Sequence, residues 1–397
     1  MKPKCLLIAL LAVGTATPAF ADYTLATLAT FNGANGARPY SDLTLLGSTL
    51  CGTTSIGGAK NIGTVFSVST AGGAPAVLAS FNGSNGEHPD AGLTLSGSTL
   101  YGTTEYGGAK NDGTVFSVPV TGGSPTVLTS FDGTHGAVPV GGLILSGSTL
   151  YGTTTSGGAN DAGTVFSLPV AGGTPTTLAS FDFTDGAAPF ARLTLSGSTL
   201  YGTTVNGGAN SDGTVFSLPA AGGTPMVLAS FSGANAGGPV AGLNLSGSTL
   251  YGTTNAGGAN NDGTVFSLAT VGGTPTVLAS FDGTNGSGPA GDLILSGNTL
   301  YGTTIGGGAY DDGTVFSLPI AGGTPTVLAS FNYDGASGAF PQRGLILSGS
   351  TLYGTTASGG ANGYGTVFEL SPSVPEPATG SLLLFGSAGI LVRRRRK

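Results

Sequence analysis

One strand-and-turn unit is repeated along nearly the whole sequence. In the copy that starts at Gly142, four short apolar or β-branched runs are separated by turns rich in Gly, Asn and Asp. The runs read LILS, STLYGTT, GTVFSLP and TPTTLASF. Strand-sized runs that are punctuated in this way predict consecutive antiparallel strands joined by short connections. Each unit is therefore predicted to be a four-stranded meander, and the fold depends on how the units assemble.

The phase of the repeat predicts a closed ring. The third-strand motif GTVF recurs seven times, beginning at Gly63, Gly113, Gly163, Gly213, Gly263, Gly313 and Gly365. The chain opens on a lone fourth strand, Tyr23 to Phe31, and the last unit stops after its third strand, Gly365 to Leu370. A ring explains this offset, because the N-terminal strand completes the last sheet. Propeller blades are four-stranded and repeat every ~40–50 residues. We predict an all-β, seven-bladed β-propeller over residues 22–373 with one-plus-three closure; a β-solenoid is the alternative.

Composition supports a folded chain and excludes one class of partner. The chain has 74 Gly and 22 Pro, which approaches low-complexity composition, but 39% of its residues are hydrophobic and only 8% are charged. Residues 22–373 carry five basic and 18 acidic side chains, a net charge of −13. A body this acidic lacks the basic surface that binds a phosphate backbone. We therefore expect no nucleic-acid partner.

The two ends differ from the repeats. Residues 1–21 have Lys2 and Lys4, then an apolar run, then a small-x-small site at Ala21, which together predict a secretory signal peptide. Residues 378–392 are mostly apolar and precede a basic cluster. Fifteen helical residues span about 22 Å, short of a hydrocarbon core of ~30 Å, but arginines can snorkel to the interface. We expect a short transmembrane helix, with the basic end cytoplasmic and the body exported.

The C-terminal segment, residues 374–397, has a Pro-Glu-Pro triplet, a predicted short hydrophobic helix and a terminal arginine cluster, in that order. In these features it closely resembles the PEP-CTERM sorting signal of Gram-negative bacteria. The resemblance implies processing by the membrane enzyme exosortase and release or anchoring at the cell surface. The residues that match the signal are Val374, Pro375, Glu376, Pro377, Arg393, Arg394, Arg395 and Arg396. An ordinary membrane anchor would give the same topology but would not explain the triplet.

The repeat resembles the Gloeo/Verruco tandem repeat over Tyr23 to Leu370. The shared features are YGTT, a GGA-N turn, GTVF, and a Ser-Phe strand followed by a G-x-x-G loop. That family is known for its repeat and for its varied surface anchors, and not for an established activity. The resemblance therefore implies a location more than a function.

No reactive constellation recurs in the repeats, and no cofactor is expected. The two histidines, His88 and His135, occupy non-equivalent loop positions and are too few for a zinc site without carboxylates. Cys51 stands where the other copies have a strand tyrosine, which favours a buried, inert thiol. The glycines form no phosphate-binding motif.

Two sets of carboxylates have structural explanations. Asp112, Asp212, Asp262 and Asp312 precede the GTVF glycine and predict Asp-Gly hairpin turns. A second set, Asp132, Asp182 and Asp282, follows the fourth-strand phenylalanine, where other copies have Asn or Ser. Asx-turns explain the second set, and calcium binding by those three loops is the alternative.

These features favour a non-enzymatic, exported surface or extracellular-matrix protein that binds polysaccharide through loops on one face. Near-identical repeats suit a multivalent binder, whereas catalysis requires asymmetry. The alternative is a secreted propeller hydrolase or lyase acting on glycans, which needs a pair of carboxylates. The non-repeating candidates for such a pair are Glu87, Asp90, Asp292 and Asp334.

Overall fold

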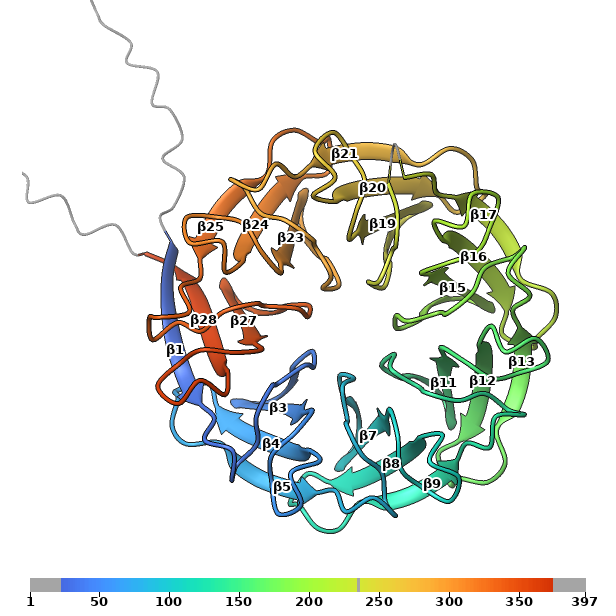
Figure 1. Ribbon diagram of the computed structural model, residues 1–397, viewed down its shortest axis with the longest axis horizontal. Helices are drawn as coiled ribbons and strands as arrows, with labels where there is room; N and C mark the ends of the chain where they lie inside the picture. Colours follow the sequence, from blue (N-terminus) through green and yellow to red (C-terminus); the bar gives the residue numbers. More distant parts are fainter. Residues whose placement is uncertain (1–22, 234–235, 374–397) are drawn as a thin grey trace, which may run out of the picture.

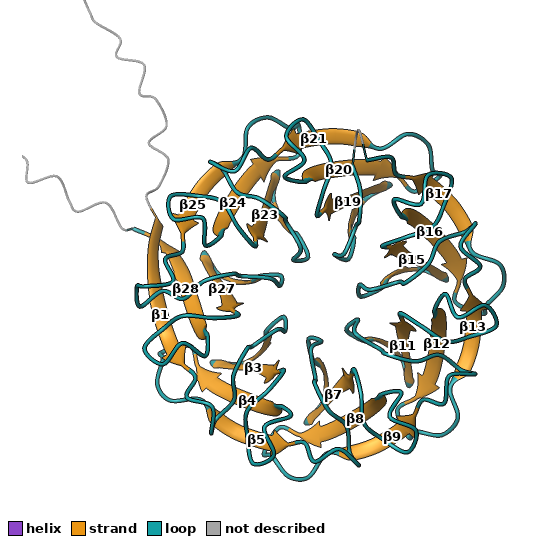
Figure 2. Cartoon of the chain, in the orientation of Figure 1, coloured by secondary structure: helices purple, strands orange, loops and turns teal. Residues whose placement is uncertain are grey.

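The computed structural model describes residues 23–233 and 236–373, and these form a seven-bladed β-propeller. Seven antiparallel sheets of four strands each are arranged around one axis, and no helix occurs among these residues (Figures 1 and 2). The predicted propeller is confirmed and the β-solenoid alternative is wrong. The predicted signal peptide and the sorting segment from Val374 onward lie outside the described residues. Within the described part of the chain, no helix is long and apolar enough to cross a membrane.

Each blade has four strands, from the innermost strand beside the axis to the outermost strand at the rim. The innermost strands are β2 (Thr44–Leu46), β6 (Thr94–Ser96), β10 (Ile144–Ser146), β14 (Thr194–Ser196), β18 (Asn244–Ser246), β22 (Ile294–Ser296) and β26 (Ile346–Ser348). The second strands are β3 (Thr49–Thr54), β7 (Thr99–Thr104), β11 (Thr149–Thr154), β15 (Thr199–Thr204), β19 (Thr249–Thr254), β23 (Thr299–Thr304) and β27 (Thr351–Thr356). The third strands are β4 (Thr64–Ser69), β8 (Thr114–Pro119), β12 (Thr164–Pro169), β16 (Thr214–Pro219), β20 (Thr264–Ala269), β24 (Thr314–Pro319) and β28 (Thr366–Pro372). The outermost strands are β5 (Ala76–Ser80), β9 (Thr126–Ser130), β13 (Thr176–Ser180), β17 (Met226–Ser230), β21 (Thr276–Ser280), β25 (Thr326–Ser330) and β1 (Tyr23–Thr30).

The N-terminal strand closes the ring. The last sheet has the order β1-β28-β27-β26, and β1 pairs antiparallel with β28 from Tyr23 opposite Pro372 to Thr30 opposite Thr366. This is the predicted one-plus-three closure. Because β1 and β28 are antiparallel, the start of β1 lies beside the end of β28, and the first and last described residues lie at the same edge of the ring (Figure 1).

The hydrophobic core lies between adjacent blades. Phe181 follows β13, and its ring meets that of Phe216 in β16 of the next blade edge-on, with the ring centroids 5.0 Å apart. The equivalent pair occurs at all seven junctions, including Phe31 with Phe66 across the closure. Buried aromatic pairs stabilise a fold by more than the apolar area that they remove from water. Each repeat therefore needs the next repeat to bury its phenylalanine, and closure of the ring gives every repeat such a neighbour.

The glycine of the YGTT motif makes room for this core. A Cβ atom built on Gly202 would lie 2.6 Å from Cζ of Phe216 and 2.9 Å from Cδ2 of Leu193. Any larger residue would therefore displace the phenylalanine ring.

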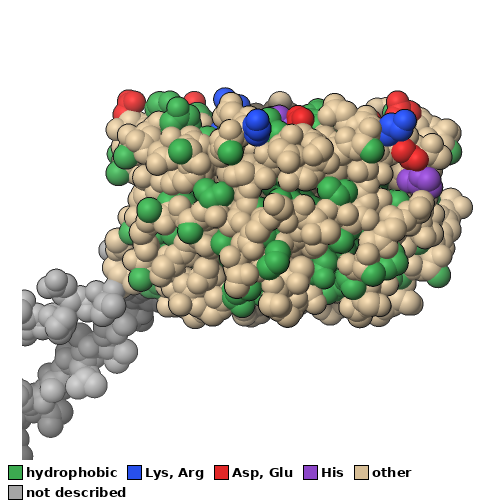
Figure 3. Space-filling model, turned by 90° about the horizontal axis from the view of Figure 1, so that it is seen from below, with side chains coloured by type: hydrophobic (Ala, Val, Ile, Leu, Met, Phe, Trp, Pro, Cys, Tyr) green, Lys and Arg blue, Asp and Glu red, His purple; other side chains and the backbone are tan. Residues whose placement is uncertain are grey.

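The two faces of the ring differ in charge. The loops from second to third strands and from outermost strands to the next innermost strands form one face. We call it the charged face, because every Lys, Arg, His, Asp and Glu of residues 23–373 lies in these loops except Glu369. The opposite, uncharged face consists of Gly-Ser or Gly-Asn turns and Gly-Gly turns. Figure 3 shows charged side chains along one edge of the ring only.

Candidate functional site

Seven loops converge on the propeller axis at the charged face. Each loop leads from an outermost strand into the next innermost strand and contains a Pro-x-x-x-Leu segment, such as Pro39–Leu43. We call these the axial loops. The residues at the third position after each proline form the axial ring: Asp42, Gly92, Gly142, Arg192, Gly242, Asp292 and Gly344.

The glycines of the axial ring accommodate its three large side chains. A Cβ on Gly242 would lie 2.9 Å from Oδ1 of Asp292, and one on Gly92 would lie 2.9 Å from Cβ of Asp42. One on Gly142 would lie 3.4 Å from Cδ of Arg192. Each large side chain thus covers a glycine of an adjacent loop, and the ring has no room for side chains at all seven positions.

Backbone amides hold the two ring carboxylates in place. The amide of Gly242 donates to Oδ1 of Asp292 at 2.6 Å, and the amide of Gly344 donates to Oδ1 of Asp42 at 2.7 Å. Burial raises the pKa of Asp292, and the neighbouring Asp42 carboxylate raises it further, while Arg192 and Arg343 lower it. Within the described residues, no arginine comes within 4.0 Å of a carboxylate oxygen, since the one ion pair joins His135 to Asp132.

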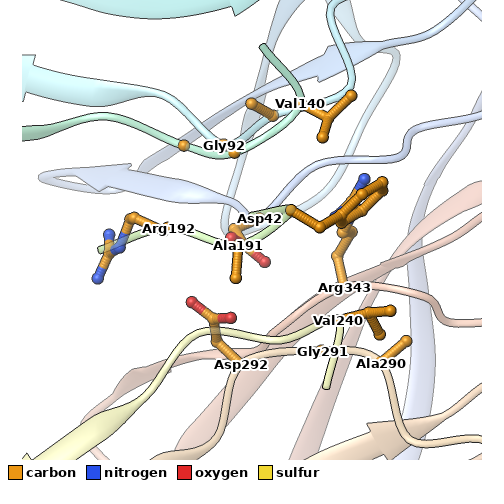
Figure 4. Close-up of a pocket in the computed structure, with 14 residues that line it drawn as sticks. Asp42, Gly92, Val140, Ala191, Arg192, Val240, Ala290, Gly291, Asp292 and Arg343 are labelled. Carbon is orange, nitrogen blue, oxygen red and sulfur yellow. The ribbon is translucent and has the colours of Figure 1, made fainter. Parts of the chain in front are cut away.

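Arg343 closes the charged-face end of the axis. Its Nε donates to the carbonyl oxygen of Tyr40 at 3.0 Å, and its guanidinium carbon lies 5.6 Å from the centroid of the Phe190 ring, three blades away. The cavity among these residues and the axial ring measures only about 20 Å³. That is room for about one water molecule. Figure 4 shows the Asp42 and Asp292 carboxylates and the Arg192 side chain around one space, with Arg343 to one side.

A larger cavity of about 490 Å³ continues along the axis beyond the ring. The Asp42, Arg192 and Asp292 side chains form its charged end. Its walls are the innermost strands β18, β22 and β26 and the leucines that precede them. These strands run from the axial loops to the turns of the uncharged face, so the cavity extends toward that face. We call it the axial channel.

Two buried polar atoms of the described residues lack a hydrogen-bond partner, and both adjoin the axial loops. They are Oδ1 of Asp90 and Oγ1 of Thr253. In the other six blades the hydroxyl equivalent to Thr253 donates to a carbonyl of the next axial loop. The equivalent acceptor for Thr253 is the carbonyl of Gly291, next to Asp292. The hydrogen bond from this threonine hydroxyl to the next axial loop is therefore missing only beside Asp292, among the seven blades described.

The Asp90 carboxyl has a raised pKa. Burial raises its pKa to about 6, against the lowering effects of Arg343, the Ser55 hydroxyl and His88. An uncompensated buried carboxylate oxygen costs free energy, so Asp90 opposes folding at neutral pH. Groups retained at such a cost are candidates for function.

The first part of each axial loop, between the outermost strand and the proline, repeats one hydrogen-bonding pattern, and we call this part the outer loop. Oδ1 of Asp182 accepts from the amides of Thr184 and Asp185 at 2.9 and 3.1 Å, and Oδ1 of Asp282 accepts from the amide of Asn285 at 3.0 Å. Oδ1 of Asp132 accepts from the amide of His135 at 3.1 Å. Asparagines make the same bond at Asn32 and Asn82. The predicted Asx-turns are thus present, and hydrogen bonds lower the pKa of each of the three aspartates.

Calcium binding by these three loops stays a prediction. Each aspartate belongs to a different outer loop. In the described ranges, no three His, Cys, Asp or Glu side chains gather around a common point.

The predicted Asp-Gly hairpin turns are wrong. Asp212 and Asp312 are the next-to-last residues of nine-residue loops and do not lie in two-residue turns. Oδ2 of each accepts from a backbone amide of the following outer loop, at Gly233 and at Tyr333, both at 2.7 Å. These carboxylates tie one loop to the next, a role that spans 21 residues and leaves no local sequence signal.

The remaining sequence candidates do not form one site. His88 packs edge-on against Tyr106, whereas His135 pairs with Asp132 in another loop. Cys51 is buried, and burial raises the pKa of its thiol to about 11, as expected of an inert thiol.

Asp90 and Asp292 both lie in axial loops near Arg343, but Glu87 and Asp334 lie in the outer parts of their loops. Sequence analysis missed Asp42, Arg192 and Arg343. The signal for the first two was their departure from glycine at one repeat position.

Comparison with known proteins supports the fold and identifies the repeat. No curated protein is similar to this chain in sequence. The extracellular domain of a hybrid two-component system from B. thetaiotaomicron is 10% identical, with a TM-score of 0.56 over 88% of this chain and 40% of that one. A 6-phosphogluconolactonase from Bacteroides uniformis is 20% identical, with a TM-score of 0.51 over 77% of this chain and 88% of that one. At these identities the likeness concerns the fold alone.

The model of the Gloeobacter/Verrucomicrobia repeat matches residues 15–216 and 246–385, which is most of the sequence. The protein therefore belongs to the Gloeobacter/Verrucomicrobia repeat family.

Proposed function

We propose that this protein is an exported, non-enzymatic propeller of the bacterial cell surface or extracellular matrix that binds polysaccharide through its charged face. The observation that carries the proposal is the one-sided distribution of ionisable side chains. The described chain ends leave from the opposite, uncharged face. A body tethered through its C-terminal end would thus turn its charged face outward.

Exposed aromatic rings on the charged face suit a carbohydrate ligand. Among the described residues, five aromatic side chains are 37–58% exposed, and all lie in loops of this face: Tyr106, Phe183, Tyr310, Tyr333 and Tyr364. Such rings offer large, rigid contact area for the apolar face of a sugar. The surrounding Asn, Asp, Ser and Thr side chains supply hydrogen-bonding groups for hydroxyls. Repetition of these loops around the ring favours multivalent binding of a long polymer.

The C-terminal segment supports the location. Its Val374-Pro375-Glu376-Pro377 stretch directly follows Ser373, the last described residue, and the preceding strand β28 ends on the uncharged side of the ring. In the proposal, exosortase recognises this segment, and the helix with Arg393 to Arg396 holds the protein in the membrane until processing.

A glycan array tests the binding proposal. The full chain is compared with a Phe183→Ala/Tyr310→Ala/Tyr333→Ala variant and with Val271→Ala, a control on the uncharged face whose side chain is 86% exposed. We expect saturable binding to one glycan class, lost in the triple variant and kept in the control. An EDTA arm separates calcium-dependent from calcium-independent binding. Absence of binding to any polysaccharide by a folded protein would contradict the proposal.

A secreted hydrolase or lyase is the second candidate, favoured by Asp90. Its raised pKa and its unpartnered oxygen are properties of a catalytic acid. The test is hydrolysis or elimination on polysaccharide substrates by the native chain and by Asp90→Asn. Turnover that disappears in the variant, while glycan binding persists, would establish the enzyme.

A further inference from the structure

We propose that the axial channel binds a zwitterionic small molecule with an apolar body, of the α-amino-acid type, which enters from the uncharged face. The site is separate from the polysaccharide surface, because it lies beyond the axial ring and opens on the opposite side.

The dimensions of the channel set the size of the ligand. Its volume of about 490 Å³ falls in the usual range for small-molecule sites, roughly 300–1,000 Å³. The cavity of about 20 Å³ at the axial ring admits only a water-sized object. The channel is therefore blind for an organic molecule, and the charged end is its floor.

The walls select an apolar body. Leu243, Ile294, Leu295, Ile346 and Leu347 line one side, and several of them stay partly exposed in the channel. Asn244 is the one amide side chain among the wall residues. Covering these side chains with an apolar group removes apolar surface from water and so favours binding.

The two carboxylates of the floor select a cationic group. The position between Asp42 and Asp292 in the ring is Gly344, and a Cβ there would lie 3.0 Å from Oδ1 of Asp42 and 3.2 Å from Cβ of Asp292. Each carboxylate has one oxygen bound by a backbone amide and no arginine within 4.0 Å. An ammonium group placed here relieves the repulsion between the carboxylates.

Arg192 selects an anionic group. Its side chain is exposed at the floor of the channel, and it makes no side-chain hydrogen bond with any described residue. A guanidinium binds a carboxylate in a bidentate manner. A molecule with an ammonium and a carboxylate on the same carbon atom satisfies both halves of the floor, while its side chain lies along the leucines and isoleucines.

The failed hydrogen bond of Thr253 points to the same place. This buried hydroxyl, 1% exposed, is left unpartnered beside the loop of Asp292, although its six equivalents are bonded. The hydroxyl-to-carbonyl hydrogen bond of the other six blades is thus missing next to the charged floor of the channel. Such a loss is expected where a site is retained for binding at the expense of stability.

Calorimetric titration of the full chain tests the site with three matched probes. They are L-phenylalanine, 2-phenylethylamine, which lacks the carboxylate, and 3-phenylpropionate, which lacks the amine. We expect saturable binding of phenylalanine and at least about tenfold weaker binding of each single-charge analogue.

Variants assign the two charges. Asp292→Asn is expected to weaken phenylalanine and phenylethylamine by about tenfold, and Arg192→Gln to weaken phenylalanine while sparing phenylethylamine. Ile294→Trp fills the channel and is expected to abolish binding. Asp182→Asn, in an outer loop, is the matched control and is expected to bind like the native chain.

No saturable binding of phenylalanine at about 10 mM would overturn the proposal, as would binding that Ile294→Trp leaves unchanged in a folded protein. Equal affinity for all three probes would also overturn it. The glycan array on the same variants keeps this result separate from the proposed function, because neither outcome depends on polysaccharide binding.

Discussion

The blade junctions and the propeller axis follow opposite rules. The same Phe pair recurs at every junction, and every blade repeats the glycine beneath its Phe ring and a Thr-Thr hydroxyl contact of 2.8 Å. Around the axis, one repeat position holds Asp, Gly or Arg. A junction is buried between two copies, so a change in one copy must fit its neighbour. The axial ring faces a shared space, where a few different side chains can coexist if the others are glycine.

The largest expected effect is at a junction. Phe216→Ala should lower the free energy of unfolding by about 3–5 kcal/mol, because it removes a fully buried ring that meets Phe181. Urea denaturation followed by circular dichroism measures the loss. Arg192→Ala in the axial ring is the comparison, and we expect a change within about 0.5 kcal/mol. Equal losses would mean that the two regions do not differ in this way.

Asp90→Asn should stabilise the protein at neutral pH. The pKa of Asp90 is about 6 in the folded protein, above its ordinary value of 3.8, so the folded state holds this proton more tightly. The contribution of the protonated Asp90 carboxyl to the free energy of unfolding is fully present below about pH 4 and is lost as the pH rises through about 6. The variant should therefore gain about 2–3 kcal/mol at pH 7 and nothing at pH 4. Urea titrations of both proteins across this range check the prediction, and parallel curves would contradict it.

Gly242→Ala should disturb the axial ring. The new methyl group would lie 2.9 Å from Oδ1 of Asp292 and 3.0 Å from the carbonyl oxygen of Arg192, so we expect a loss of about 1–3 kcal/mol. Replacing Asp292 by Gly in the same chain should recover part of that loss. Thermal unfolding of the single and double variants measures the coupling. Additive effects would show that the glycines do not accommodate the large side chains.

The smallest effect is expected in the outer loops. Asp182→Asn keeps the Oδ1 acceptor that caps this turn, and Asn32 and Asn82 already make the same bond. The melting temperature should not change. A clear decrease would indicate that the carboxylate charge itself has a role, as in calcium binding.

The architecture could be predicted from the sequence because the same strand-and-turn pattern occurs in every repeat. Strand bounds, blade number and the closure by Tyr23–Thr30 all follow from the phase of GTVF and its neighbours. The axial site was not predicted, because Arg192 and Arg343 come together with Asp42 only after the ring closes over 300 residues. A charged residue at a repeat position that is usually glycine marks a candidate site residue. Which of these residues come together depends on how the blades curve into a ring, and the sequence of one unit does not specify that curvature.

The pairing of β1 with β28 also has a mechanical consequence. Any force applied at the C-terminal end enters through β28, which is bonded on one side to β27 and on the other to β1. A pull along this strand loads two hydrogen-bonded ladders in shear at once, instead of peeling a free edge. The closure of the ring by β1 therefore also secures the strand through which the proposed tether would pull.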